Sequence, residues 1–149
     1  MSYQSRIPAD PDYLSRLGRA FYNFTYLEWV VVWTIVKLSA DGFGSVPQGK
    51  SAFYIAKALI TAIATTSPAL PDELRRDLVR FHESYLVAIA RRNKLLHAHP
   101  YTAAGGAQQL GGGGVDWPPQ EVDEAAKLFE EVAIAGNAIF HGALAKVRP

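Results

Sequence analysis

The chain has 149 residues, a formal net charge of +1 at pH 7 and 49% hydrophobic residues, which is typical of one globular domain with a buried core. Near-neutral charge argues against a protein that coats nucleic acid without specificity, although it is compatible with a local basic patch. The sequence has no cysteine, which excludes thiol catalysis, disulfides and thiolate metal sites and fits a reducing cytoplasm.

No membrane or export segment is expected. Residues 1–10 are polar and lack the apolar stretch of a signal peptide. The most hydrophobic run, residues 29–36, is far shorter than the ~20 residues of a membrane span. We therefore expect a cytoplasmic protein that does not enter the membrane.

The first helix is predicted to begin at Asp10-Pro11, an N-cap residue followed by a proline whose missing N–H costs nothing there. Apolar residues at spacings of three and four run from Leu14 through Phe21 to Leu38, and Asp41-Gly42 ends the pattern, so the helix should stop near residue 40. Residues 30–33 are also β-prone, which leaves a strand as the alternative there.

Two more helices follow a loop over residues 41–50. The second is predicted for about residues 51–65, and its inward side chains are predicted to be Phe53, Ala56, Leu59, Ile60 and Ile63. The third covers about residues 71–98 and carries most of the basic residues. Pro100 disfavours helical geometry at the preceding residue, so the third helix should end just before it.

The fourth helix is predicted to start near Pro118-Pro119 and to run to about Val147. Residues 101–117 between the third and fourth helices are rich in glycine, and we interpret them as a flexible connection, either a mobile linker or a lid. The expected fold is all-α: a single domain over residues 1–149 that forms a bundle of four main helices with a Gly-rich loop before the last one.

The segment Arg92-Asn93-Lys94-Leu95-Leu96-His97 is the strongest candidate for chemistry. Asn93 and His97 are four residues apart and share a helix face, whereas Arg92 lies roughly 140° from His97 around the axis. A phosphodiester needs a cation for its oxygens and a group that transfers protons near neutral pH, and arginine and histidine supply both. To act on the same phosphodiester as His97, the Arg92 side chain must curl round the helix or meet His97 of a second copy. The alternative interpretation is a solvated basic helix end with a capping histidine.

Arg92-Asn93, three residues and His97 resemble the R-x4-6-H signature of the HEPN superfamily, in the form with a polar residue directly after the arginine. This resemblance implies an all-α bundle that pairs so that two signatures line one cleft. It also implies a metal-independent ribonuclease. In such an enzyme Arg92 would bind the phosphate, Asn93 would supply an orienting amide, and His97 would act as general acid and base. HEPN ribonucleases often belong to toxin–antitoxin, abortive-infection or RNA-processing systems, so an antitoxin and a separate nucleotidyltransferase are candidate partners. Other members are inactive or bind nucleotides.

Several nearby residues are candidates for supporting roles. Arg91 and Lys94 extend the basic segment toward the phosphates of RNA, and Tyr101 can stack on a base or close the helix end. Glu28 interrupts an apolar helix face, so we expect it to pair with a basic residue or to lie near the site. His99 is a further supporting candidate. The histidines lack a carboxylate or thiolate at ligand spacing, so no metal site and no cofactor are expected.

Residues 44–51, GSVPQGKS, match the G-x-x-x-x-G-K-[ST] pattern of the phosphate-binding P-loop. That function requires a strand that leads directly into Gly44 and a helix that leaves from Lys50-Ser51. A helix follows, but residues 37–43 separate the β-prone segment from Gly44, and no later βα units are predicted to build a parallel sheet. An ordinary loop with Ser51 as helix cap is the favoured interpretation.

The sequence thus favours an RNA-cleaving homodimer over two rivals. One is a non-catalytic helical module that binds a partner protein or nucleotide through the same cleft, and the other is a P-loop nucleotide hydrolase.

Overall fold

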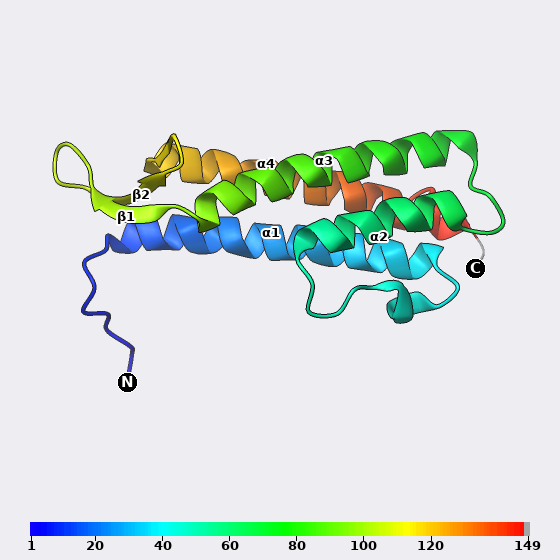
Figure 1. Cartoon of the computed structure of the whole chain (residues 1–149), viewed down its shortest axis with the longest axis horizontal. Helices are drawn as coiled ribbons and strands as arrows, with labels where there is room; N and C mark the ends of the chain where they lie inside the picture. Colours follow the sequence, from blue (N-terminus) through cyan, green and yellow to red (C-terminus); the bar gives the residue numbers. More distant parts are fainter. Residues whose placement is uncertain (148–149) are drawn as a thin grey trace.

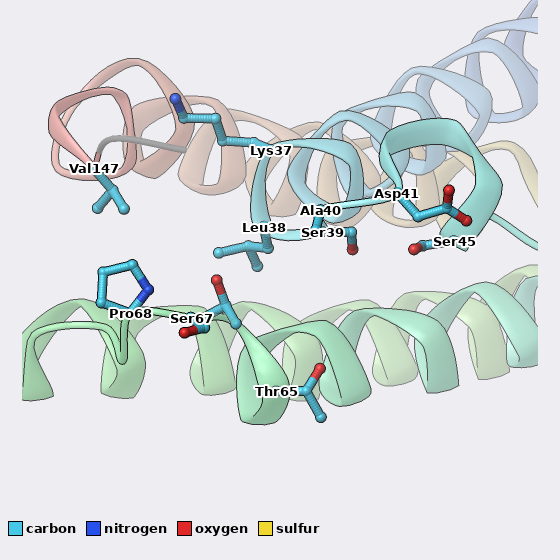
Figure 2. A pocket seen from close by; sticks show the side chains of 11 residues that line it. Lys37, Leu38, Ser39, Ala40, Asp41, Ser45, Thr65, Ser67, Pro68 and Val147 are labelled. Atoms are coloured by element: carbon cyan, nitrogen blue, oxygen red, sulfur yellow. The ribbon is translucent and has the colours of Figure 1, made fainter.

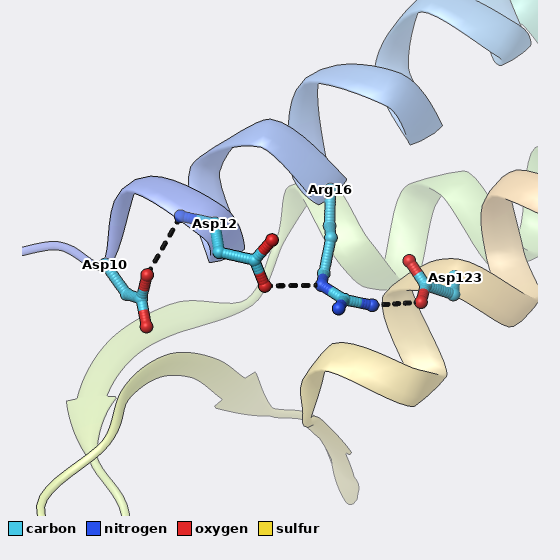
Figure 3. Close-up of polar contacts among 4 residues, drawn as sticks. All are labelled: Asp10, Asp12, Arg16 and Asp123. Atoms are coloured by element: carbon cyan, nitrogen blue, oxygen red, sulfur yellow. Dashed lines mark hydrogen bonds and ion pairs between the residues drawn. The ribbon is translucent and has the colours of Figure 1, made fainter.

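Helix α1 (Pro11–Leu38) begins where the sequence predicts. In the computed structural model, which describes residues 1–147, the Asp10 carboxylate caps α1 by accepting a hydrogen bond from the Asp12 backbone N–H at 2.9 Å. Arg16 then pairs with Asp12 at 2.8 Å and with Asp123 of α4 (Pro119–His141). Figure 3 shows this row of contacts, which ties the start of α1 to α4.

The body of the molecule is a bundle of α1, α2 (Ala52–Thr65), α3 (Asp72–Leu96) and α4. Side-chain contacts give the helix directions. Phe24 and Glu28 of α1 contact Arg92 and Tyr85 of α3, respectively, so these two helices are antiparallel. Contacts of Arg16 with Asp123 and of Tyr26 with Asn137 show that α1 and α4 are parallel. The mostly helical four-helix fold predicted from the apolar periodicity is confirmed.

Helix α2 covers only part of the bundle. It has 14 residues against 28 in α1, and Figure 1 shows it beside the C-terminal half of α1. The N-terminal half of α1 and the C-terminal half of α3 therefore face each other with no helix laid across them. Side chains that the sequence pattern assigns to the interior stay exposed at this end, including Leu14 and Phe21 of α1.

The helix predictions need small corrections. Helix α1 ends at Leu38 and α3 at Leu96, each two residues earlier than expected. The β-prone residues 30–33 belong to α1, so the strand alternative is wrong. Phe53 of α2 was expected to point inward, but it is exposed, while its predicted companions Ala56, Leu59 and Ile63 are buried.

The Gly-rich connection is not a flexible loop. It forms a three-stranded antiparallel sheet of β1 (His99–Thr102), β2 (Gln108–Gly112) and β3 (Val115–Trp117), in the order β1-β2-β3. Glycines build its turns: Gly113 (φ 63°) and Gly114 (φ 79°) form the two-residue link between β2 and β3. Such tight hairpin links require positive φ, which glycine adopts without a steric penalty.

The sheet is fastened to the helices by Tyr13. Its hydroxyl donates to the Trp117 carbonyl at 2.6 Å and accepts from the Leu110 backbone N–H at 3.0 Å. Burial raises the pKa of Tyr13, the hydrogen bond from Leu110 opposes that effect, and Tyr101 adds to it. The hydroxyl therefore stays protonated and keeps its donor role.

Helix α4 is shorter than predicted. It ends at His141, with Gly142 as C-cap, and a short 3-10 turn over Leu144–Lys146 replaces the helix expected up to Val147. A Cβ at Gly142 would lie 2.6 Å from the Ala138 carbonyl oxygen, so glycine permits the sharp departure of the chain. Within residues 1–147, no helix has both the length and the apolar character that crossing a membrane requires.

Candidate functional site

The predicted catalytic residues lie at the C-terminal end of α3, at the part of the bundle that α2 does not cover. Asn93 is exposed on the last full turn, and His97 is the C-cap residue, whose backbone N–H donates to the Asn93 carbonyl at 3.1 Å. The imidazole of His97 is exposed as well. Both residues are thus exposed to solvent at the end of α3, where their spacing of four residues predicts one shared face.

Arg92 points to a different side of α3. Its guanidinium lies over the Phe24 ring of α1, with Cζ 4.6 Å from the ring centroid, which is the geometry of a favourable cation–π contact. Its Nε atom is buried without a hydrogen-bond partner among the described residues, and Arg92 takes part in none of their ion pairs. Arg92 is therefore a half-buried cation without a carboxylate in contact.

Glu28 lies close to this arginine but does not form the salt bridge that the sequence suggested. Its carboxylate accepts a hydrogen bond from the Tyr85 hydroxyl at 3.1 Å. Burial raises the pKa of Tyr85, Glu28 raises it further, and Arg92 lowers it. The tyrosine thus remains a donor, and Glu28 and Arg92 act on the same hydroxyl.

Sequence reasoning did not assign a role to Tyr85. A signal for it exists, because Tyr85 precedes Arg92 by seven residues and so lies on the same helix face. Phe24 and Glu28 are likewise four residues apart on the facing side of α1. These four side chains form one layer between the two helices.

Arg91, predicted to bind phosphate, has structural partners instead. It pairs with Glu121 in the first turn of α4 and stacks on Trp117, with Cζ 4.4 Å from the ring centroid. Lys94 differs, because it is exposed and outside every ion pair among residues 1–147. Of the two basic neighbours of the motif, Lys94 is the one available to solvent.

The two remaining predicted residues, His99 and Tyr101, lie on β1, directly after the motif. Tyr101 accepts a hydrogen bond from Gln109 Nε2 at 2.8 Å. His99 is exposed. The sheet thus places both residues on an ordered strand beside the end of α3, where the sequence indicated only a loop.

A groove of about 240 Å³ opens between α1, α3 and the sheet. Among residues 1–147, Arg92 contributes the only charged side chain to its lining, and the other lining residues are apolar: Leu17, Ala20, Phe21, Leu95, Leu96, Ala98, Leu110 and Phe129. Of the residues that line this α1–α3 groove, Phe21 and Leu96 are exposed. It is an apolar surface with one cation in it.

The P-loop pattern does not have the structural context it requires. Gly44 belongs to the 3-10 turn η1 (Gly42–Ser45), and the strands of the described chain all lie between residues 99 and 117. Lys50 lies over the Tyr54 ring, 6.0 Å from its centroid. These residues therefore form the loop between α1 and α2.

A separate cavity of about 380 Å³ opens at the opposite end of the bundle from His97. Figure 2 shows it between the end of α1, the η1 turn and the end of α2, with Lys37, Asp41 and Ser45 among its lining residues. None of the residues predicted to act on RNA lines it.

Comparisons of the chain with protein-family models, with curated proteins and with solved structures give no match.

Proposed function

We propose that the protein is a metal-independent endoribonuclease that acts as a homodimer in the cytoplasm, with a site that resembles those of HEPN ribonucleases. The observation that carries the proposal is the state of Arg92. This arginine borders an open groove and contacts no carboxylate of residues 1–147, while the adjacent Arg91 is paired with Glu121. A cation held in this way is suited to an anionic ligand.

The chemistry is transfer of a phosphoryl group within RNA. The neutral imidazole of His97 takes the proton of a 2′-hydroxyl, and the 2′-oxygen attacks the adjacent phosphorus. The bond from phosphorus to the 5′-oxygen breaks, and the 5′-oxygen receives a proton from the histidinium form of His97. Arg92 neutralises the non-bridging oxygens, on which charge increases in the transition state. The products are a 2′,3′-cyclic phosphate and a 5′-hydroxyl.

One protomer does not complete this site, because Arg92 faces α1 while Asn93 and His97 face solvent. We propose that a second copy covers the α1–α3 groove, where α2 leaves space for it. A two-fold axis there would set Arg92 of each protomer against His97 of its partner. The apolar side chains of Phe21 and Leu96 then become buried at the interface.

The test is cleavage of single-stranded RNA in the presence of a chelator. We expect products that end in a 2′,3′-cyclic phosphate, and at least about a hundredfold lower rates for His97→Ala and Arg92→Ala. Lys37→Ala is the matched control, since Lys37 lies at the far end of the bundle. A folded protein that cleaves no RNA, or variants as active as the parent, would contradict the proposal.

A second candidate function is that of a non-catalytic module that captures a partner protein. It is favoured by an apolar groove of about 380 Å³ between α1 and α4, lined by Tyr26, Trp29 and Trp33 together with residues of α4. Trp29 and Trp33 are exposed, and an apolar groove of this kind can receive the apolar face of an amphipathic helix. An antitoxin would dock at this groove. Partner binding that is lost in Trp29→Ala, in a protein without ribonuclease activity, would favour this function.

A further inference from the structure

The sheet presents one face to solvent beside the candidate site. In its register His99 is opposite Gly111, Tyr101 is opposite Gln109, and Gly111 is opposite Asp116. Residues directly opposite each other project from the same face, and neighbours along a strand alternate. His99, Tyr101, Gln109 and Asp116 therefore share the outer face. Leu110 and the buried Trp117 project from the inner face toward the helices.

The Tyr101 ring covers Gly111 in the middle of this outer face. A Cβ added to Gly111 would be 2.6 Å from Cε1 of the ring and 3.2 Å from Cδ1, so the ring occupies the space that a side chain would need. Gln109 Nε2 donates to the Tyr101 hydroxyl at 2.8 Å and holds the ring in place. The side chain keeps 37% of its surface exposed. The sheet thus offers an ordered aromatic surface to solvent.

A carboxylate stands at the edge of this ring. Asp116 Oδ1 would be 3.0 Å from the same added Cβ, so it lies on the outer face beside Tyr101. Asp116 is exposed, and within residues 1–147 it forms no ion pair and no side-chain hydrogen bond. A carboxylate accepts hydrogen bonds at both oxygens and donates none.

These groups together match a nucleobase. An aromatic side chain stacks on any base, but a carboxylate selects bases that present N–H donors. On its Watson–Crick edge guanine presents two adjacent donors, N1–H and the N2 amino group. On the same edge of adenine, cytosine and uracil, the neighbour of each donor is an acceptor. His97 and His99 are two residues apart, so their Cα atoms lie within about 7 Å. The outer face of the sheet therefore begins within about 7 Å of His97, measured between Cα atoms.

We propose that the outer face of the sheet binds an unpaired guanine of the RNA substrate, stacked on Tyr101 and hydrogen-bonded by Asp116. Gly111 keeps the face bare so that the ring can cover it, and Gln109 fixes the ring. This inference rests on the proposed ribonuclease function, whose substrate it narrows to RNA with an unpaired guanine next to the cleaved bond.

The experiment measures binding without cleavage. In a His97→Ala background, fluorescence anisotropy compares single-stranded oligouridylates that contain one guanosine, one inosine or one adenosine. We expect the guanosine oligomer to bind about tenfold more tightly than the other two, because inosine lacks the N2 amino group and adenosine lacks both donors. Asp116→Asn should remove this preference.

Three further variants test the ring. Tyr101→Leu should weaken binding of every oligomer about tenfold, whereas Tyr101→Phe keeps the ring and most of the affinity. Gly111→Ala would displace the ring and also crowd the Asp116 carboxylate, so it should weaken binding of every oligomer and reduce the preference for guanosine as well. Gly18→Ala is the matched control, because a Cβ at Gly18 meets no atom within 4 Å. Circular dichroism checks that each variant is folded.

The outcomes separate the two proposals. Equal affinity for the three oligomers, or a preference that persists in Asp116→Asn, would overturn the guanine inference even if the wild-type protein cleaves RNA. A guanine preference that disappears in Asp116→Asn would support the inference, and it would do so even if the wild-type protein proved unable to cleave.

Discussion

Dimerisation through the α1–α3 groove is tested most sharply at Phe21. This side chain lines the groove and is 61% exposed in the single chain. Phe53 on α2 is the matched control, since it is a helical phenylalanine with 59% exposure that lies outside the groove. Alanine at either position suits an exposed helix and should leave the monomer folded.

The magnitude follows from the area. A phenylalanine side chain has roughly 200 Å² of accessible surface, so 61% exposure leaves about 120 Å² to be buried by a partner. At about 25 cal/mol per Å², that burial contributes about 3 kcal/mol in each protomer. The value is an upper bound, because an exposed contact is rarely covered completely. Both protomers lose the contact, so the upper bound for the dimer is about 6 kcal/mol. With about half of it realised, Phe21→Ala should raise the dimer dissociation constant by about a hundredfold.

Sedimentation equilibrium over a range of protein concentrations measures this constant for wild type, Phe21→Ala and Phe53→Ala. Phe53→Ala should dimerise like the wild type. The reasoning is refuted if the wild type is monomeric at every concentration. It is also refuted if the two alanine variants weaken the dimer equally, because the groove would then have no special role.

Three further predictions concern the fold. Gly136→Ala would place a Cβ 2.4 Å from the Phe81 ring and should lower the free energy of unfolding in urea by about 1–3 kcal/mol, whereas Gly18→Ala should raise it by about 0.5–1 kcal/mol. Tyr13→Phe removes both hydrogen bonds that join α1 to the sheet and should cost about 1–3 kcal/mol in the same assay; no change would contradict that role. Burial lowers the pKa of His82 below its usual 6.5, although Glu83 opposes this. As pH falls, His82 therefore takes up a proton more readily in the unfolded chain than in the folded one. The free energy of unfolding should consequently decrease as pH drops below 6.5. His82→Gln should flatten that pH dependence in thermal melts, and an unaltered slope would exclude His82 as its source.

The helices could be predicted from the sequence because their signals are local. Asp10-Pro11 begins α1 as expected, and the apolar spacing locates all four helices with ends mostly within two residues. The exception is the end of α4, where the apolar pattern continues past Gly142 although the backbone turns away. Periodicity records which residues prefer burial, and it does not record where a glycine lets the chain leave the helix.

The sheet was missed because its strands are short and their residues have weak β propensity. β2 consists of two glutamines, a leucine and two glycines, none of which alternates in the way that marks a strand. The pair Gly113-Gly114 before Val115 was the available signal, since two glycines between extended segments favour a tight hairpin. Pairing between strands depends on contacts that the local sequence does not display.

The site was predictable only as far as helix geometry reaches. The angular separation of Arg92 from Asn93 and His97 follows from the 3.6-residue period. In the structure Arg92 packs against α1, while Asn93 and His97 are exposed. The period does not predict which side chains of other helices the polar residues contact. Glu28 meets Tyr85 instead of a basic side chain, and Arg91 meets Glu121, which is 30 residues away in the sequence. Such contacts depend on how the helices pack together.

The most direct test of the composite site is cleavage by a mixture of two inactive variants. Arg92→Ala and His97→Ala are purified separately, mixed, allowed to exchange subunits and assayed with single-stranded RNA and a chelator. Each mixed dimer should contain one intact site, so the equimolar mixture should regain about a quarter of the wild-type sites and form 2′,3′-cyclic phosphate ends. A mixture as inactive as its components, beside an active wild type, would contradict a site shared between two protomers.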